Sequence, residues 1–165
     1  MEPLRVRFMP DPRAHRGRVM SGEGPGAPVH AGSFLRKREI VLDTALLASP
    51  AELLRILTHE VYHFVWLRLG NPARASYENL VAEEIRRGAR GELGWSSEVR
   101  KRALTAHDRK ARTRRWRQYA CESFCDTASW LVGGGRHPEF TLARSWRLRR
   151  RAWFCHAEAL KRISV

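Results

Sequence analysis

The chain has 165 residues and a mass of 19.1 kDa, with 43% hydrophobic residues and a formal net charge of +14. This length suits one domain that buries roughly 70% of its unfolded surface, and no stretch approaches the about 20 uninterrupted apolar residues of a membrane span. The N-terminus also lacks the apolar core of a signal peptide, so we expect a cytoplasmic protein.

The N-terminal part is rich in proline and glycine. We therefore expect residues 1–28 to be a loose or extended segment with one short strand at residues 4–8, and residues 29–165 to form a single domain. Residues 38–42 should form a strand, with residues 33–35 paired beside it. Such a strand could bind an extended peptide along its edge, or it could be an ordinary edge strand, and the sequence does not separate the two.

The first long helix should cover residues 50–69. Ser49 and Glu52 fit a capping box with Pro50 in the first turn, and Gly70 ends the apolar pattern. The apolar face is wide, which predicts a largely buried helix.

An H-E-x-x-H motif, His59, Glu60 and His63, lies in the middle of this helix. Residues four apart lie one turn above each other on one face, so both histidine rings can reach the same ion. Glu60 is placed to take a proton from a water on that ion, and the pattern is typical of zinc metalloproteases. The alternative is that both histidines are core residues satisfied by hydrogen bonds.

The middle of the chain is basic. Residues 75–87 should form an amphipathic helix, residues 91–96 a loop anchored by Trp95, and residues 97–106 a short helix. Residues 109–117 are densely basic, and 27 of the 31 basic residues in the chain are arginine. This charge favours an acidic partner such as nucleic acid or an anionic membrane surface, although a GC-rich genome would give the same bias and such a run is usually a solvated helix face.

A second buried helix should cover residues 113–132, with Glu122 and Asp126 as its only acids. Two carboxylates four apart share one face, and they are costly in an apolar helix unless they are paired or bind metal. Cys121 and Cys125 could bind metal, but buried thiols are the favoured interpretation. Each is rotated by about 100° from its acidic neighbour, so one helix face should not easily present both pairs. A last helix from about residue 141 should bury Trp146, Leu148, Trp153, Phe154, Ala157, Leu160 and Ile163.

The two motif helices together resemble the zincin metallopeptidases of the gluzincin type, in which a later helix carries E-x-x-x-D or a close variant. The resemblance implies that His59, His63 and Glu122 bind Zn2+. It further implies Glu60 as the general base and Asp126 as the partner of the His59 ring. It also implies a mainly helical α+β, minimal zincin-like domain, with a small N-terminal β-sheet packed on the metal-binding helix and a peptide or protein as substrate.

The resemblance covers roughly a third of the chain. His63 and Glu122 lie 59 positions apart, separated by a basic helical insert, so the chain looks more like minimal bacterial zincins, including the ImmA/IrrE peptidases. Tyr119 and His107 are the candidates for stabilising the transition state, and Tyr119 could equally pack in the core. Two further hypotheses remain: a SprT-like DNA-associated protease or zinc-stabilised nucleic-acid-binding module, and an inactive zinc-binding pseudo-peptidase. The sequence indicates no oligomeric state.

Overall fold

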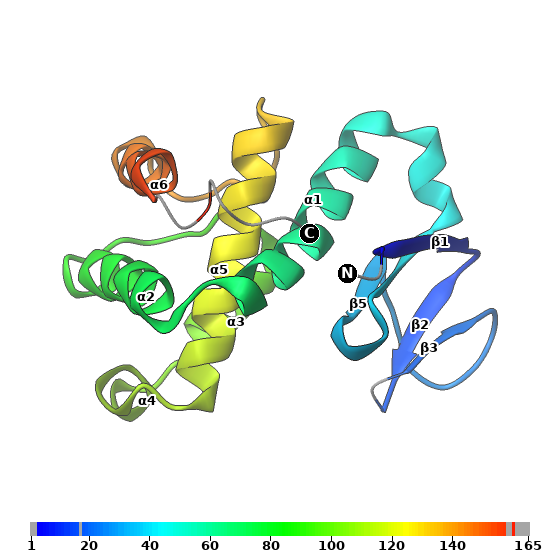
Figure 1. The fold of residues 1–165 in the computed structure, drawn as a ribbon, viewed down its shortest axis with the longest axis horizontal. Coiled ribbons are helices and arrows are strands. Elements are labelled where there is room, and N and C mark those ends of the chain that lie inside the picture. The colour runs from blue at the N-terminus through cyan, green and yellow to red at the C-terminus, as the bar shows by residue number, and fades with distance from the viewer. Residues whose placement is uncertain (1–2, 17, 158–159, 161–165) are drawn as a thin grey trace.

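The structure is a computed structural model that describes residues 3–16, 18–157 and 160. Figure 1 shows a lobe of strands on one side, the long helices α1 and α5 in the middle, and further helices on the other side. The architecture is mixed α+β and mainly helical with small N-terminal sheets, as predicted. None of the helices in these ranges is both long enough and apolar enough to cross a membrane.

Two three-stranded sheets form the N-terminal lobe. The strands are β1 (Arg5–Met9), β2 (Pro12–His15), β3 (Arg18–Ser21), β4 (Ala27–Pro28), β5 (Ala31–Phe34) and β6 (Glu39–Asp43). In the first sheet, β6 lies between β1, which is parallel to it, and β5, which is antiparallel. In the second sheet, β2 pairs antiparallel with both β3 and β4. The strands predicted at residues 4–8 and 38–42 are confirmed as β1 and β6. The strand predicted to pair with the second of them is confirmed as β5.

The N-terminal segment is not loose in the described ranges. Four strands lie before residue 29, and β1 pairs with β6, so part of this segment belongs to the same sheet as residues 39–43. The sequence did not indicate β2, β3 and β4 because strands of two to four residues are too short to carry a hydrophobic period. Their pairing depends on partners elsewhere in the chain.

Six α-helices follow in the described part of the chain: α1 (Pro50–Arg68), α2 (Asn71–Arg86), α3 (Trp95–Arg102), α4 (Ala106–Ala111), α5 (Arg114–Gly133) and α6 (Arg144–His156). Two short 3-10 helices, η1 (Leu35–Lys37) and η2 (Thr44–Ala48), flank β6. The helices predicted at residues 50–69 and 113–132 are confirmed to within one residue at each end.

The capping box predicted for α1 is wrong. The Ser49 side chain caps no backbone N–H, because Ser49 also ends η2 and its backbone is not in the extended conformation of a capping residue. Glu52 instead pairs with Arg55 at 2.8 Å and lies 3.0 Å from His137. A capping box does form at α4, where Thr105 and Asp108 bond each other's backbone reciprocally.

Two other helix boundaries differ from the prediction. α2 starts at Asn71 rather than residue 75, because Pro72 occupies its first turn, where a missing N–H costs nothing. The helix expected at residues 97–106 is α3, which starts at Trp95 and already ends at Arg102, and α4 follows as a separate helix from Ala106. Trp95 does not anchor the preceding loop: it is 67% exposed, whereas Leu93 is fully buried.

α1 lies between two apolar cores. Towards the first sheet it packs Ile56 and Phe64 against Ile40, Leu42 and Leu46. On its other side a larger core joins it to α2 and α5, made of Val65, Trp66, Leu69, Tyr77, Val81, Trp116, Tyr119, Ala120, Phe124 and Cys125. Packing on both sides fixes the orientation of the α1 residues that lie between the two cores.

One prediction for α6 is wrong and one falls outside the structure. Leu148 is 50% exposed, whereas Arg150, which the apolar pattern would place outside, is fully buried. Trp146, Trp153 and Phe154 are partly buried as expected, and Ile163 lies outside the described residues.

The buried Arg150 joins three parts of the helical region. Its guanidinium lies 2.8 Å from Glu84 of α2 and 2.7 Å from Glu92 in the loop before α3, and all three side chains are fully buried. Lys101 of α3 lies 3.1 Å from the other oxygen of Glu92. Buried charges are tolerated only when paired in this way, so this cluster fixes α2, α3 and α6 relative to one another.

Candidate metal centre

His59 and His63 face the middle of α5. Around these rings α1 and α5 run antiparallel. The Ser129 hydroxyl donates to the Arg55 carbonyl at 2.8 Å. Later in α1, His59 meets Asp126 and His63 meets Cys121, which come progressively earlier in α5. The rings lie 4.9 Å apart, centroid to centroid, as expected for residues one turn apart on one helix face.

Three predicted ligand atoms converge between these helices. Nε2 of His59 lies 3.2 Å from Nε2 of His63 and 3.2 Å from Oε2 of Glu122, and Nε2 of His63 lies 4.0 Å from the same oxygen. Donor atoms about 2.0–2.1 Å from a tetrahedral zinc ion are about 3.3 Å apart. The triangle therefore has nearly the size that a zinc ion requires.

The far nitrogen of each ring has its own partner on α5. Nδ1 of His59 lies 2.7 Å from Oδ1 of Asp126, as expected, and Nδ1 of His63 lies 3.5 Å from Sγ of Cys121. With a proton on each Nδ1, both Nε2 atoms present lone pairs towards the Glu122 carboxylate. Three lone-pair atoms at these distances repel one another unless a cation lies between them.

The electrostatics favour a cation here. Burial lowers the pKa of His59, but the charge of Asp126 and the hydrogen bonds to Asp126 and Glu122 outweigh this and raise it well above its usual value. Burial raises the pKa of Glu122, but its bond to His59 and the charges of His63, His59 and Arg100 bring that pKa down to about 2. Glu122 is therefore an ionised candidate ligand. A metal ion at this position would supply the positive charge that otherwise keeps a proton on His59.

The first turn of α3 supports both carboxylates, a contribution that the sequence analysis missed. The backbone N–H and hydroxyl of Ser97 donate to Oδ2 of Asp126 at 3.1 and 2.6 Å. The Ser96 hydroxyl donates to Oε2 of Glu122 at 2.7 Å, and Arg100 lies 3.2 Å from its Oε1. The basic insert thus supplies hydrogen bonds that orient the candidate ligand Glu122 and the partner of His59, Asp126.

Gly94 makes this approach possible. Its φ of −178° is extended backbone that any residue adopts, so backbone strain does not require glycine here. The requirement is space, because a Cβ at this position would lie 2.5 Å from Oδ2 of Asp126 and closer still to Cγ and Oδ1.

The two helix cysteines also face the histidines, so the expectation that one face cannot present both pairs is wrong. At about 100° per residue, the α5 residues 121, 122, 125 and 126 span an arc of about 140°, and two rings one turn apart can contact all of it. Hydrogen bonds from Cys125 and from His63 lower the pKa of Cys121 to about 6, so its sulfur accepts from the His63 ring.

Cys125 is an alternative third ligand. Its Sγ and one nitrogen of each histidine lie within 4.8 Å of one another. Burial, however, raises the pKa of Cys125 well above its usual value, and metal binding requires the thiolate. Glu122 is already ionised and lies close to both rings, so it fits better.

Glu60 lines a cavity of about 560 Å³ between the β-lobe and α3, together with both histidines and Glu122. The hydroxyl of Ser33 in β5 donates to Oε2 of Glu60 at 2.5 Å and also lies 3.1 Å from its carbonyl oxygen. Ser33 therefore fixes one carboxylate oxygen and leaves the other for a proton transfer within the cavity. No motif in the sequence indicated this serine, because it belongs to a strand 27 positions before Glu60.

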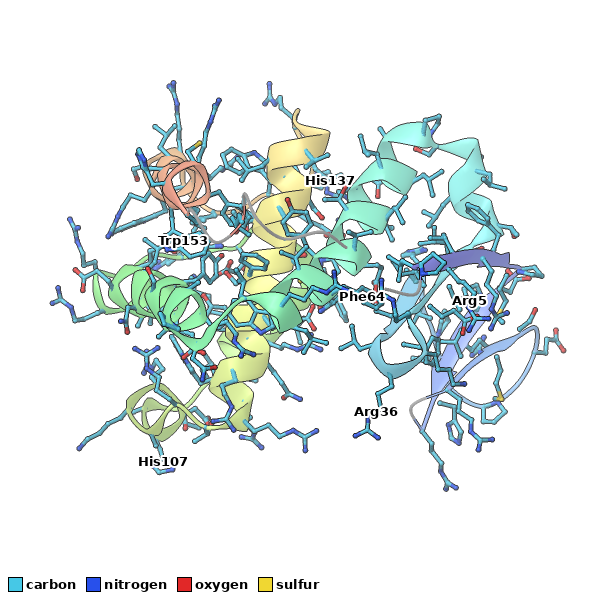
Figure 2. All side chains as sticks on the ribbon, in the orientation of Figure 1. Arg5, Arg36, Phe64, His107, His137 and Trp153 are labelled. Atoms are coloured by element: carbon cyan, nitrogen blue, oxygen red, sulfur yellow. The ribbon has the colours of Figure 1, made fainter. Side chains whose placement is uncertain are left out.

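Neither predicted transition-state stabiliser lies at the centre. Tyr119 is fully buried and donates to Glu92 at 2.6 Å, within the Arg150 cluster. His107 is exposed on α4, at the end of the helical region in Figure 2, and does not line the cavity. Helical spacing placed Tyr119 within about 60° of Glu122 on α5, but its hydroxyl bonds to Glu92, which holds the phenol in the core.

No protein-family model, curated protein or solved structure matches this chain. The function must therefore be inferred from the residues and the geometry of the centre itself.

Proposed function

We propose that the chain is a zinc-dependent peptidase. The observation that carries this proposal is the convergence of two imidazole nitrogens and an ionised carboxylate at 3.2–4.0 Å, from His59, His63 and Glu122. Three protein ligands of this kind, with a cavity beside them, are typical of catalytic rather than structural zinc sites.

The residues around these ligands have distinct roles. A bound zinc ion would supply a water of lowered pKa and an electrophile for a substrate carbonyl. Glu60, held by Ser33, would take the proton of that water and pass it to the leaving amine. Asp126 and Cys121 would orient the two histidine rings, so that both present Nε2 to the ion.

Arg100 replaces Tyr119 and His107 as the candidate for stabilising developing negative charge. It lines the same cavity as Glu60, its side chain is 40% exposed, and it already lies 3.2 Å from Glu122. A guanidinium at this position would favour an oxyanion that forms on a bound carbonyl.

The substrate would bind as an extended chain. β5 lies at the edge of its sheet, and its residues Ala31, Gly32 and Ser33 line the cavity. An unpaired strand edge offers backbone hydrogen bonds to a peptide of any sequence. This orientation would place a peptide bond of the substrate between Glu60 and the metal ligands.

The test compares zinc content and proteolysis of the full chain with those of Glu60→Gln. We expect about one zinc ion per chain in both proteins and cleavage of fluorescein-labelled unfolded casein by the unmodified chain alone. Glu83→Gln, which alters a partly exposed glutamate on α2, is the control and should cleave normally.

Loss of zinc from Glu60→Gln would make Glu60 a structural residue and contradict its role as base. Zinc binding by the unmodified chain without any cleavage would instead favour the inactive pseudo-peptidase or the nucleic-acid-binding module.

A further inference from the structure

α3 presents different faces to two neighbouring cavities. Ser96 and Arg100 line the cavity of the metal centre. Val99 and Arg102 line a second cavity, of about 720 Å³, and Trp95 lines both. The two cavities therefore meet at the N-terminal end of α3, directly beside the metal ligands.

The second cavity exposes apolar surface on one face of α3. Trp95 is 67% exposed and Val99 is 44% exposed, and the two lie one turn apart. The backbone N–H of Trp95 donates to Glu139 at 3.0 Å, which fixes the point from which the indole extends. An exposed tryptophan with a fixed backbone, next to a cavity, is the kind of residue that dominates binding energy at interfaces.

The charges around this cavity favour an acidic ligand. Three basic residues line it, Arg90, Lys101 and Arg102, against two acidic residues, Glu98 and Glu139. Arg102 is paired with Glu98 at 2.8 Å, but its side chain is 77% exposed and can reach solvent. Arg90 is also exposed. Lys101 is bound to the buried Glu92 at 3.1 Å, so a ligand would meet the charges of Arg90 and Arg102, which attract carboxylates and repel basic peptides.

We propose that this second cavity is a substrate subsite that takes a large apolar side chain flanked by acidic residues in an extended peptide. The inference rests on the proposed peptidase function. The peptide would run from β5 across the metal centre to Trp95, where the apolar side chain packs against Trp95 and Val99 and the acidic neighbours face Arg90 and Arg102.

Binding can be measured without cleavage, using zinc-loaded Glu60→Gln and fluorescence anisotropy. The probe is a fluorescein-labelled Gly/Ser peptide that carries one phenylalanine between two glutamates. We expect Trp95→Ala in this background to weaken binding about tenfold or more, and Val99→Asp to weaken it as well. Leu148→Ala removes an apolar side chain of similar exposure on α6, outside both cavities, and should leave binding unchanged. Unchanged thermal unfolding temperatures would show that each variant is folded.

Equal binding by Trp95→Ala and Leu148→Ala would overturn the subsite. The subsite would also be overturned if a peptide with lysines in place of the glutamates bound as tightly. A single-stranded oligonucleotide whose binding depended more strongly on Trp95 than binding of the peptide does would overturn it too. Binding that depends on Trp95, in a chain whose unmodified form cleaves nothing, would support the subsite and contradict the peptidase function alone. Cleavage of the same peptide that is unaffected by Trp95→Ala would contradict the subsite alone.

Discussion

Replacing Gly94 by alanine should disturb the metal centre without changing any of its ligands. The added Cβ would lie 2.5 Å from Oδ2 of Asp126, so the carboxylate must move by about 1 Å to restore van der Waals contact. Asp126 is 3% exposed and is held by His59 at 2.7 Å and by Ser97 at 2.6 Å. The movement must break at least one of these bonds.

Two effects of known size follow. Loss of the carboxylate partner of a metal-binding histidine weakens metal affinity about 10–100-fold. Overpacking a buried position costs about 1–3 kcal/mol of unfolding free energy, which for a chain of this length corresponds to a fall of about 2–12 °C in Tm.

Zinc affinity is measured by competition with a chelator, and Tm by thermal unfolding of the zinc-free chain. Gly133→Ala is the matched control, because a Cβ at that position meets no atom within 4 Å. In an Asp126→Ala background the obstructing carboxylate is gone, so Gly94→Ala should then have little further effect. Unchanged zinc affinity in Gly94→Ala would refute the reasoning. So would effects of Gly94→Ala and Asp126→Ala on the free energy of zinc binding that add to within about 0.5 kcal/mol in the double variant.

Three further predictions concern the carboxylates. Asp126→Ala should weaken zinc affinity about 10–100-fold without removing a ligand, and a change within about twofold in a chelator competition would contradict its role. Arg150→Met leaves Glu84 and Glu92 buried without their partner and should lower the urea-unfolding free energy by about 3–5 kcal/mol. The control Arg151→Met, at an exposed neighbouring position, should change this free energy little. Equal losses in the two variants would be inconsistent with a buried ion cluster. Burial raises the pKa of Glu92, but the charges of Arg150 and Lys101 and its hydrogen bonds bring it to about 2. Because this pKa is depressed on folding, the stability that Glu92 contributes is complete above the usual glutamate pKa and is lost as the pH falls towards about 2. The advantage of the unmodified chain over Glu92→Gln in urea unfolding should therefore shrink between about pH 5 and about pH 2, and a constant advantage across that range would contradict the assignment.

The sequence was sufficient for features that lie within one helix. The spacing of His59 and His63 predicted a shared face on α1, and the cost of two acids in an apolar helix singled out Glu122 and Asp126 on α5. The structure brings these four residues together. Periodicity and burial cost are local properties, which explains why they could be predicted from the sequence.

Contacts between distant elements could not be predicted in this way. Ser97 reaches Asp126 across 29 positions, and Ser33 reaches Glu60 across 27. Neither serine belongs to a motif, and only the packing of α3 and β5 against the long helices gives them a role. Trp95 was misjudged for a related reason, since an apolar residue in a loop is equally consistent with an anchor in the core and with an exposed binding residue.

The central claim is that His59, His63 and Glu122 bind one zinc ion. Crystals of the zinc-loaded chain, measured on both sides of the zinc absorption edge, test it most directly. The account predicts one anomalous peak about 2.0–2.2 Å from Nε2 of each histidine and from a carboxylate oxygen of Glu122. A peak bound by Cys121 or Cys125 in place of Glu122, or no peak between α1 and α5, would contradict it.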